Sequence, residues 1–166
     1  MVGATSASRT SPRREKSTMK NAKPHQRDLR KGRYSQENQV YHVTTTTLNR
    51  APIFKDFAAA RLMIGVMKKS DALKQTTTLA CVVMPDHMHW LFQLNKTQTL
   101  SKLIQAIKST SAHMIGKRIW QSGFYDHAMR KDEDMLAIAR YIIANPVRAG
   151  LVKRVGDYPH WHAVWL

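Results

Sequence analysis

The segment from residue 76 to residue 94 constrains the fold more than any other part of the sequence. Two apolar and β-branched runs, 76–84 and 87–94, are separated only by Pro85-Asp86, a turn-forming pair. We therefore expect an antiparallel hairpin. Within the second run, apolar residues occupy positions 88, 90, 92 and 94, and His87 and His89 alternate with them. Since successive side chains of a strand point to opposite faces, the apolar face belongs to a core and both imidazoles lie on the other face.

Patterns elsewhere place two strands and three helices around this hairpin. A β-branched run predicts a strand over 40–47, and a strand-like stretch covers 119–129. Apolar stripes predict helices over about 56–68, from a Thr99 cap to residue 115, and over about 132–145, where Pro146 ends the helix. The order β-α-β-β-α-β predicts an α+β fold, a ferredoxin-like antiparallel sheet with two helices on one face. An added C-terminal helix carries Tyr141.

Charge indicates the class of partner. Lys and Arg number 27 against 11 Asp and Glu, and the net charge of +16 favours binding to polyanions, above all nucleic acid. Residues 1–33 carry half of this charge and almost no large apolar groups. We expect them to form a disordered basic tail ahead of one domain over 34–166. A tail without function, and a basic protein that is merely soluble, remain open.

The sequence shows no sign of a membrane or secretory protein. No segment approaches the roughly 20 apolar residues of a membrane span, and residues 1–20 lack the apolar centre of a signal peptide. One cysteine, Cys81, stands in an apolar run, which excludes an intramolecular disulfide and a thiolate zinc site. We expect a cytoplasmic protein without a membrane partner.

The first candidate site is the pair His87 and His89, which are two residues apart on one predicted strand. His87 and His89 stand roughly 7 Å apart between Cα atoms if both lie on one strand face, so their nitrogens can converge on one metal ion. Imidazole suits Mn, Zn or Ni and serves Mg less well, so an oxygen ligand and a substrate phosphate should complete the shell. We expect Mg or Mn as the metal. A structural pair without metal is the alternative. A second such pair, His160 and His162, is interpreted as packing of a docked tail without a strand hairpin. The remaining histidines, His25, His42, His113 and His127, are interpreted as isolated.

A phosphodiester transfer that keeps the bond energy needs a side chain that attacks phosphorus and holds the cut strand covalently. A tyrosine is the candidate for this nucleophile. Of the five tyrosines, only Tyr141 falls on a predicted helix that also places a polar residue on the same helical face. Asn145 follows at i+4, so both project from one helical face and the amide oxygen is available to the same metal. The alternative is a core tyrosine on an amphipathic helix.

Four motifs, in this order, resemble the REP-associated tyrosine transposases of bacteria, within the IS200/IS605-like class of single-tyrosine HUH transposases. They are Gly-Arg-Tyr-Ser at 32–35, Tyr-His-Val-Thr at 41–44, Val-Met-Pro-Asp-His-Met-His-Trp-Leu at 83–91 and Tyr-Ile-Ile-Ala-Asn-Pro-Val-Arg-Ala-Gly-Leu at 141–151. The resemblance implies a metal-dependent strand-transfer enzyme with His87 and His89 as ligands. Tyr141 is then the nucleophile that forms a 5′-phosphotyrosine. Asn145 stands where the wider class places a glutamine as third ligand, and it is one methylene shorter.

The resemblance also implies the substrate, which is single-stranded DNA cut beside a hairpin formed by a palindromic repeat. Basic residues expected to contact its phosphates are Arg33, Lys102, Lys108, Lys117, Arg118 and Arg148. A non-cleaving DNA-binding protein descended from such a transposase, and a basic RNA-binding domain, are the alternatives. The sequence does not decide between a monomer and a homodimer.

Overall fold

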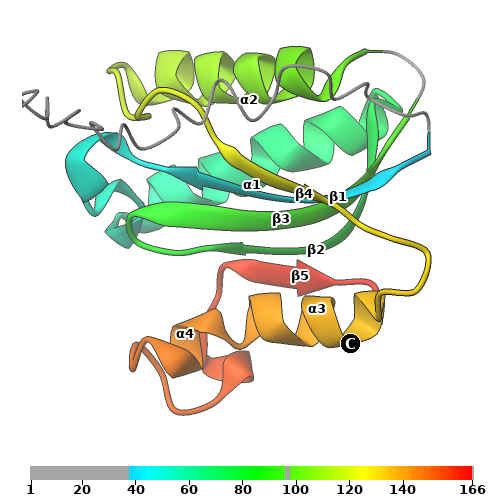
Figure 1. Ribbon diagram of the computed structural model, residues 1–166. Coiled ribbons are helices and arrows are strands. Elements are labelled where there is room, and N and C mark those ends of the chain that lie inside the picture. The colour runs from blue at the N-terminus through cyan, green and yellow to red at the C-terminus, as the bar shows by residue number, and fades with distance from the viewer. Residues whose placement is uncertain (1–37, 96–97, 166) are drawn as a thin grey trace, which may run out of the picture.

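A computed structural model of the chain describes residues 38–95 and 98–165. The predicted basic tail and Arg33 lie outside the described residues. The strands are β1 (Val40–Thr46), β2 (Thr76–Val83), β3 (His87–Leu94), β4 (Tyr125–Ala128) and β5 (Trp161–Ala163). The α-helices are α1 (Phe57–Ala72), α2 (Leu100–Ile115), α3 (Met135–Ile143) and α4 (Asn145–Arg148), and short 3-10 helices are η2 (Leu48–Arg50), η3 (Ile53–Lys55) and η4 (Val155–Asp157). Figure 1 shows their arrangement.

One antiparallel sheet organises the domain, in the strand order β4-β1-β3-β2-β5. β1 and β3 lie side by side in its centre, paired so that Thr44 is opposite His89 and Thr46 is opposite His87. The predicted hairpin of β2 and β3 is confirmed, with Val83 opposite Met88 next to the turn. The α+β, ferredoxin-like prediction is therefore confirmed.

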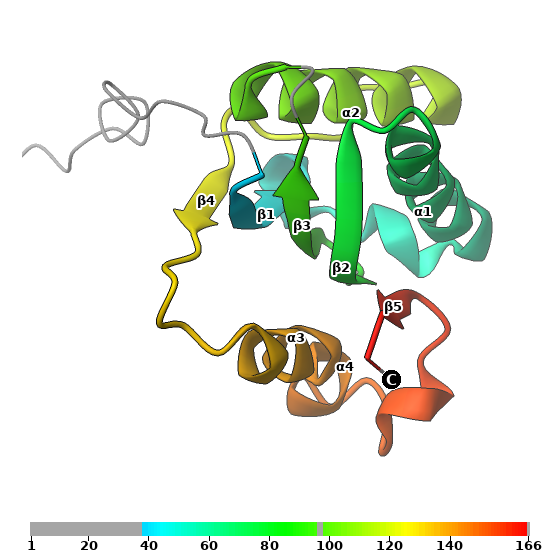
Figure 2. The ribbon, with the colours of Figure 1, turned by 90° about the vertical axis from the view of Figure 1, so that its right-hand side faces the viewer.

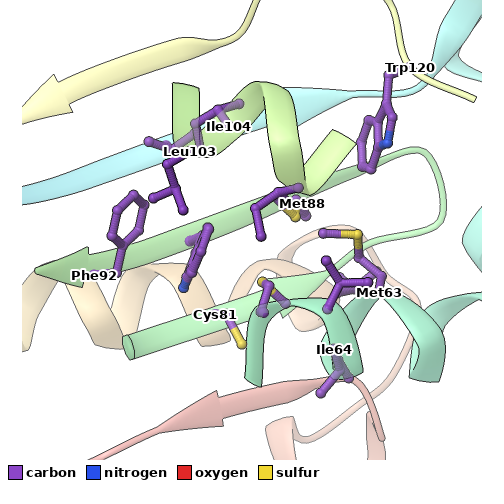
Figure 3. Close-up of a cluster of buried hydrophobic side chains, with 14 of the residues drawn as sticks. Met63, Ile64, Cys81, Met88, Phe92, Leu103, Ile104 and Trp120 are labelled. Carbon is purple, nitrogen blue, oxygen red and sulfur yellow. The ribbon is translucent and has the colours of Figure 1, made fainter. Parts of the chain in front are cut away.

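The larger core lies between the sheet and the two long helices, as predicted. Asp56 accepts a hydrogen bond from the Ala59 backbone N–H and begins α1, and Thr99 does the same for Lys102 at the start of α2. The side chains of Met88, Trp90 and Phe92 are fully buried beneath these helices. Figure 3 shows Met88 and Phe92 of this cluster together with its Met63, Ile64, Cys81, Leu103, Ile104 and Trp120. The apolar face of β3 is therefore turned toward α1 and α2, which leaves the histidine face on the other side.

A second, smaller core covers part of the histidine face. α3 packs there against β2 and β5, and its Ala139, Ile142 and Ile143 are buried with Val82 and Leu91 of the sheet. Figure 2 shows α3 on the side of the sheet opposite α1 and α2. Because Asp134 accepts hydrogen bonds from the Leu136 and Ala137 backbone N–H groups, the helix begins at Met135 rather than near residue 132.

Three predicted features are wrong in detail. The stretch 119–129 forms a strand only over β4, preceded by an isolated bridge between Thr47 and Trp120. The C-terminal tail, where no strand was predicted, forms β5, which pairs with β2 at the edge of the sheet. The third helix ends at Ile143, and Asn145 begins the separate helix α4, where Pro146 fits the first turn because it needs no N–H partner there.

Within the described residues, none of the helices has the length and apolar character needed to cross a bilayer.

Candidate active site

Polar side chains of three neighbouring strands share the face of the sheet that α1 and α2 do not cover. In one cross-strand row, β3 contributes His89, β1 contributes Thr44 and β4 contributes Tyr125. In the next row, His42 of β1 lies opposite His127 of β4. His87 lies at the start of β3, beside the β2–β3 turn. This face therefore brings together residues that are up to about 85 positions apart in the chain.

His87 is oriented by the residue before it. Its Nδ1 lies 2.6 Å from Asp86 Oδ1, and the second carboxylate oxygen of Asp86 accepts a hydrogen bond from Arg50 Nη1 at 3.1 Å. Partial burial opposes ionisation of Asp86, but its hydrogen bonds and charge interactions with His87 and Arg50 outweigh that effect and lower its pKa. With an ionised carboxylate on Nδ1, the N–H is on that nitrogen, and the Nε2 lone pair is left for a ligand.

His89 is held in the same way by uncharged groups. Its Nδ1 lies 3.0 Å from Thr44 Oγ1 and 3.3 Å from His42 Nε2. Burial chiefly, and then the neighbouring charges of His87 and His42, lower the pKa of His89 to about 3. The imidazole is therefore neutral at physiological pH, as a metal ligand must be. The rings of His87 and His89 meet edge to face with their centroids 5.0 Å apart, so the two predicted ligands lie together.

The prediction that His42 and His127 are isolated is wrong. The His42 ring lies 5.4 Å from that of His89 between centroids, and burial and then the charge of His127 lower its pKa. His127 in turn lies 2.8 Å from a carboxylate oxygen of Glu133 through Nε2. Alternation along 40–47 was the available signal for His42, since it puts this ring on one strand face, but only the pairing of β1 with β3 brings it to His89.

The donor set suits a divalent metal but does not complete its shell. Two imidazoles whose Nδ1 atoms are engaged by a neighbouring group are typical first ligands. Within residues 38–95 and 98–165, no group of three or more His, Cys, Asp or Glu side chains is arranged to hold a metal ion. A Mg or Mn ion bound by these two imidazoles would need oxygen atoms of another kind, from an amide, water or a phosphate, at its remaining positions.

Tyr141 is exposed, with 48% of its surface accessible. Of the four tyrosines that the structure describes, Tyr41 and Tyr158 are buried, and the Tyr158 hydroxyl donates to the Val83 carbonyl at 2.7 Å. Tyr125, 58% exposed, is the other accessible phenol. Figure 1 shows that α3 ends and β3 begins at the same end of the sheet, the left of that view. The C-terminal end of α3, which carries Tyr141, therefore lies at the same end of the sheet as the start of β3, which carries His87.

Two residues that follow Tyr141 contact it. The guanidinium carbon of Arg148 lies 4.3 Å from the centre of the Tyr141 ring, a cation–π arrangement. The Asn145 side-chain amide donates to the Tyr141 carbonyl at 3.1 Å and to the Ile142 carbonyl at 2.9 Å. Asn145 therefore stabilises the break between α3 and α4 through its nitrogen, and its amide oxygen remains available as an acceptor.

The other predicted phosphate contacts are distributed unevenly. Lys108 donates to the carbonyls of Gln121 and Gly123, both at 2.7 Å, so its ammonium holds the loop that leads to β4. Lys102 is exposed on α2, which covers the opposite face of the sheet from the histidines (Figure 2). Lys117 and Arg118 are exposed in the loop after α2. The sequence alone does not show which of these basic side chains lie near the histidine face and which lie away from it.

The second histidine pair lies on the edge strand. His160 is buried between the rings of Phe57 and Tyr158, with centroids at 5.2 and 5.5 Å, whereas His162 is exposed. One imidazole therefore packs inside and the other points to solvent, so the two do not converge. The interpretation as packing agrees with the position of His160 but not with that of His162.

The family model, the two relatives and the solved structure that resemble this chain are all described as transposases. The family model described as "Transposase IS200 like" matches residues 35–145. The chain is 40% identical over 82 residues to the REP-associated tyrosine transposase of Escherichia coli K12, an alignment that covers 48% of this chain and half the length of that relative. It is 32% identical over 130 residues to a Haemophilus influenzae protein described as a putative REP-associated tyrosine transposase, covering 65% of this chain and 74% of that protein. A solved structure of a REP-associated tyrosine transposase bound to a REP hairpin superposes with a TM-score of 0.64 at 30% identity, over 78% of this chain and 79% of the other.

Proposed function

Because this chain belongs to the IS200-like transposase family and is related to its REP-associated tyrosine transposases, we propose that it cleaves single-stranded DNA beside a hairpin through a covalent bond to Tyr141. Membership of a transposase family makes the protein a DNA-processing enzyme. The observation that carries the finer proposal is that α3, which carries the exposed Tyr141, packs on the histidine face of the sheet and ends where β3 begins.

The proposed reaction exchanges one phosphoester for another. Tyr141 Oη forms a bond to the scissile phosphorus and loses its proton to solvent, the bond from phosphorus to the 3′ oxygen breaks, and that oxygen takes up a proton. The products are a 5′-phosphotyrosine and a free 3′-OH. Since the phosphoester bond is conserved, the step needs no nucleotide cofactor.

The residues of the sheet face prepare this step. A bound Mg or Mn ion would polarise the scissile phosphate and stabilise its developing negative charge. His87 and His89 would hold that ion through Nε2, because Asp86 and Thr44 occupy the Nδ1 side of each ring. The amide oxygen of Asn145 is the proposed third protein ligand. Arg148, stacked on the phenol, limits the directions in which the Tyr141 ring can turn.

The proposed partner is a DNA hairpin with a flanking single strand. The related solved structure is described as bound to a REP hairpin, and the net charge of +16 of this chain favours a polyanion. An RNA-binding role on the same sheet is less favoured, because stacking on RNA bases needs exposed aromatic side chains on the central strands. Trp90 and Phe92 of β3 are instead fully buried.

A covalent-adduct assay tests the proposal. A hairpin oligonucleotide labelled on the strand 3′ of the cut should become attached to the full-length protein in the presence of Mn²⁺, as a band that survives denaturing electrophoresis. Tyr141→Phe removes only the phenolic oxygen and should abolish the band. Tyr125→Phe is the matched control, because Tyr125 is the other exposed tyrosine of the described residues, and it should leave the band in place. An adduct formed by the Tyr141 variant and lost in the Tyr125 variant would contradict the assignment. A hairpin that binds without any adduct would favour the non-cleaving DNA-binding alternative.

A further inference from the structure

The segment that follows β1 has an unusual backbone. Asn49 and Arg50 both adopt φ of 53°, in the left-handed region that residues with a side chain rarely enter. Consecutive residues in this region persist only where the surroundings fix them, and such positions concentrate at functional sites. The backbone at Asn49 and Arg50 is therefore strained and must be held by its surroundings.

Contacts with the β2–β3 turn hold this backbone. The Thr47 backbone N–H and hydroxyl both donate to the Asp86 carbonyl, at 2.8 and 2.9 Å, and the hydroxyl also lies 2.7 Å from the Ala51 carbonyl. Further along, the Phe54 backbone N–H donates to the Pro85 carbonyl at 2.9 Å. The strained turn is therefore fastened to the turn that precedes His87.

The consequence is a guanidinium fixed beside the predicted metal ligands. Arg50 Nη1 lies 3.1 Å from Asp86 Oδ2, and the other oxygen of the same carboxylate lies 2.6 Å from His87 Nδ1. One carboxylate thus links the guanidinium to the imidazole. The Arg50 side chain is nevertheless 71% exposed, so most of its five N–H donors face solvent.

We propose that Arg50 binds a phosphate of the DNA strand at the His87–His89 site. A guanidinium offers paired donors that match the oxygens of a phosphate, and within the described part of the chain Asp86 contacts Arg50 through Nη1 alone. The bound phosphate is the scissile one or its immediate neighbour, because a single carboxylate separates the guanidinium from a metal ligand. The inference rests on the proposed function for the identity of the strand.

The alternative is that Arg50 acts only on Asp86, as a counter-ion that keeps the carboxylate oriented toward His87. The two roles differ in what they change. A phosphate contact contributes to DNA affinity and to its salt dependence, whereas a counter-ion contributes to metal affinity when DNA is absent.

The test uses full-length variants and a hairpin oligonucleotide with a single-stranded flank. Arg50→Gly removes the side chain and suits the positive φ, since glycine enters this region freely. Arg50→Lys keeps the charge and removes the paired donors. Lys55→Ala is the matched control, because Lys55 is an exposed cation of the neighbouring η3 that has no ion pair with Asp86 among the described contacts. For each, DNA affinity is measured against salt concentration, together with the rate of adduct formation and the Mn²⁺ affinity without DNA.

We expect Arg50→Gly to reduce the slope of log affinity against log salt by about one and to slow adduct formation by about tenfold or more. Its Mn²⁺ affinity without DNA should stay within about twofold of the wild type. Arg50→Lys should recover the salt slope but not the adduct rate. A slope changed no more than in Lys55→Ala, or a loss confined to Mn²⁺ affinity, overturns the proposal. If the wild type forms no adduct, the proposed cleavage fails, while the salt slope still decides whether Arg50 binds phosphate.

Discussion

Replacement of Asp86 by Asn should weaken metal binding while leaving the fold intact. The carboxylate lies 2.6 Å from His87 Nδ1, a short, charge-assisted contact. Loss of such a partner behind a ligating histidine typically reduces metal affinity by about 10–100-fold, or about 1.4–2.8 kcal/mol. Asparagine has nearly the same size, and its oxygen can still accept from Nδ1. We therefore expect the lower end, about tenfold, for Asp86→Asn and a larger loss for Asp86→Ala.

The fold should survive because the structural contacts of Asp86 use its main chain. Its carbonyl accepts from the Thr47 backbone N–H and hydroxyl, and neither hydrogen bond involves the carboxylate. Asp157→Asn provides the matched control, since Asp157 pairs with Arg154 at 3.2 Å in the surface segment around η4. Both variants remove one surface carboxylate and one ion pair with arginine.

Two measurements check this prediction. Calorimetric titration with Mn²⁺ in the absence of DNA should give a weaker affinity for Asp86→Asn and an unchanged one for Asp157→Asn. The rate of adduct formation should then recover in Asp86→Asn as Mn²⁺ is raised to saturation. Equal Mn²⁺ affinities in the two variants would refute the role assigned to Asp86, and a rate that saturating Mn²⁺ does not restore would place its effect outside metal binding.

The remaining predictions address ligand choice, acid stability and the edge of the sheet. His87→Ala should abolish the adduct, whereas His162→Ala should retain it in the same assay; equal loss from both would overturn the choice of histidine pair. The pKa of His89 is lowered from 6.5 to about 3 on folding, so the unfolded chain takes up a proton between these values that the folded chain does not. The free energy of unfolding should therefore fall as pH drops from 6.5 toward 3, and His89→Gln should flatten this pH dependence in urea titrations. An unchanged pH dependence in His89→Gln would show that other groups cause the loss of stability. Tyr158→Phe should lower the free energy of unfolding by about 1–3 kcal/mol, because the buried Val83 carbonyl loses its side-chain donor; an unchanged urea midpoint would show that the carbonyl is compensated.

The features that the sequence predicted well are local ones. The alternation over 87–94 and the Pro85-Asp86 pair together determine which face of β3 is apolar, and the structure buries Trp90 while leaving His89 on the other face. The cap at Thr99 likewise acts on neighbouring residues and was predicted, and the predicted start of the first helix near residue 56 lies within one residue of its start at Phe57.

The features that it missed depend on pairing between distant segments. His42 reaches His89 only because β1 pairs with β3 in one particular register, and a shift of one residue would turn its ring to the other face. β5 is three residues long and has no clear strand pattern of its own, so it exists because the edge of β2 accepts it. Asn145 illustrates a third limit, because its spacing from Tyr141 does not reveal that its side-chain nitrogen caps the end of α3.

The two separate apolar clusters support different parts of the candidate site. The cluster under α1 and α2 supports β1 and β3, and with them the histidines, whereas the cluster around Ala139, Ile142 and Ile143 supports the helix that carries Tyr141. A change of side-chain volume in the second cluster would shift or tilt α3 across β2 without repacking the first. Under the proposed function, side-chain changes at these three residues would therefore alter how the Tyr141 phenol approaches a DNA strand while the imidazoles keep their arrangement.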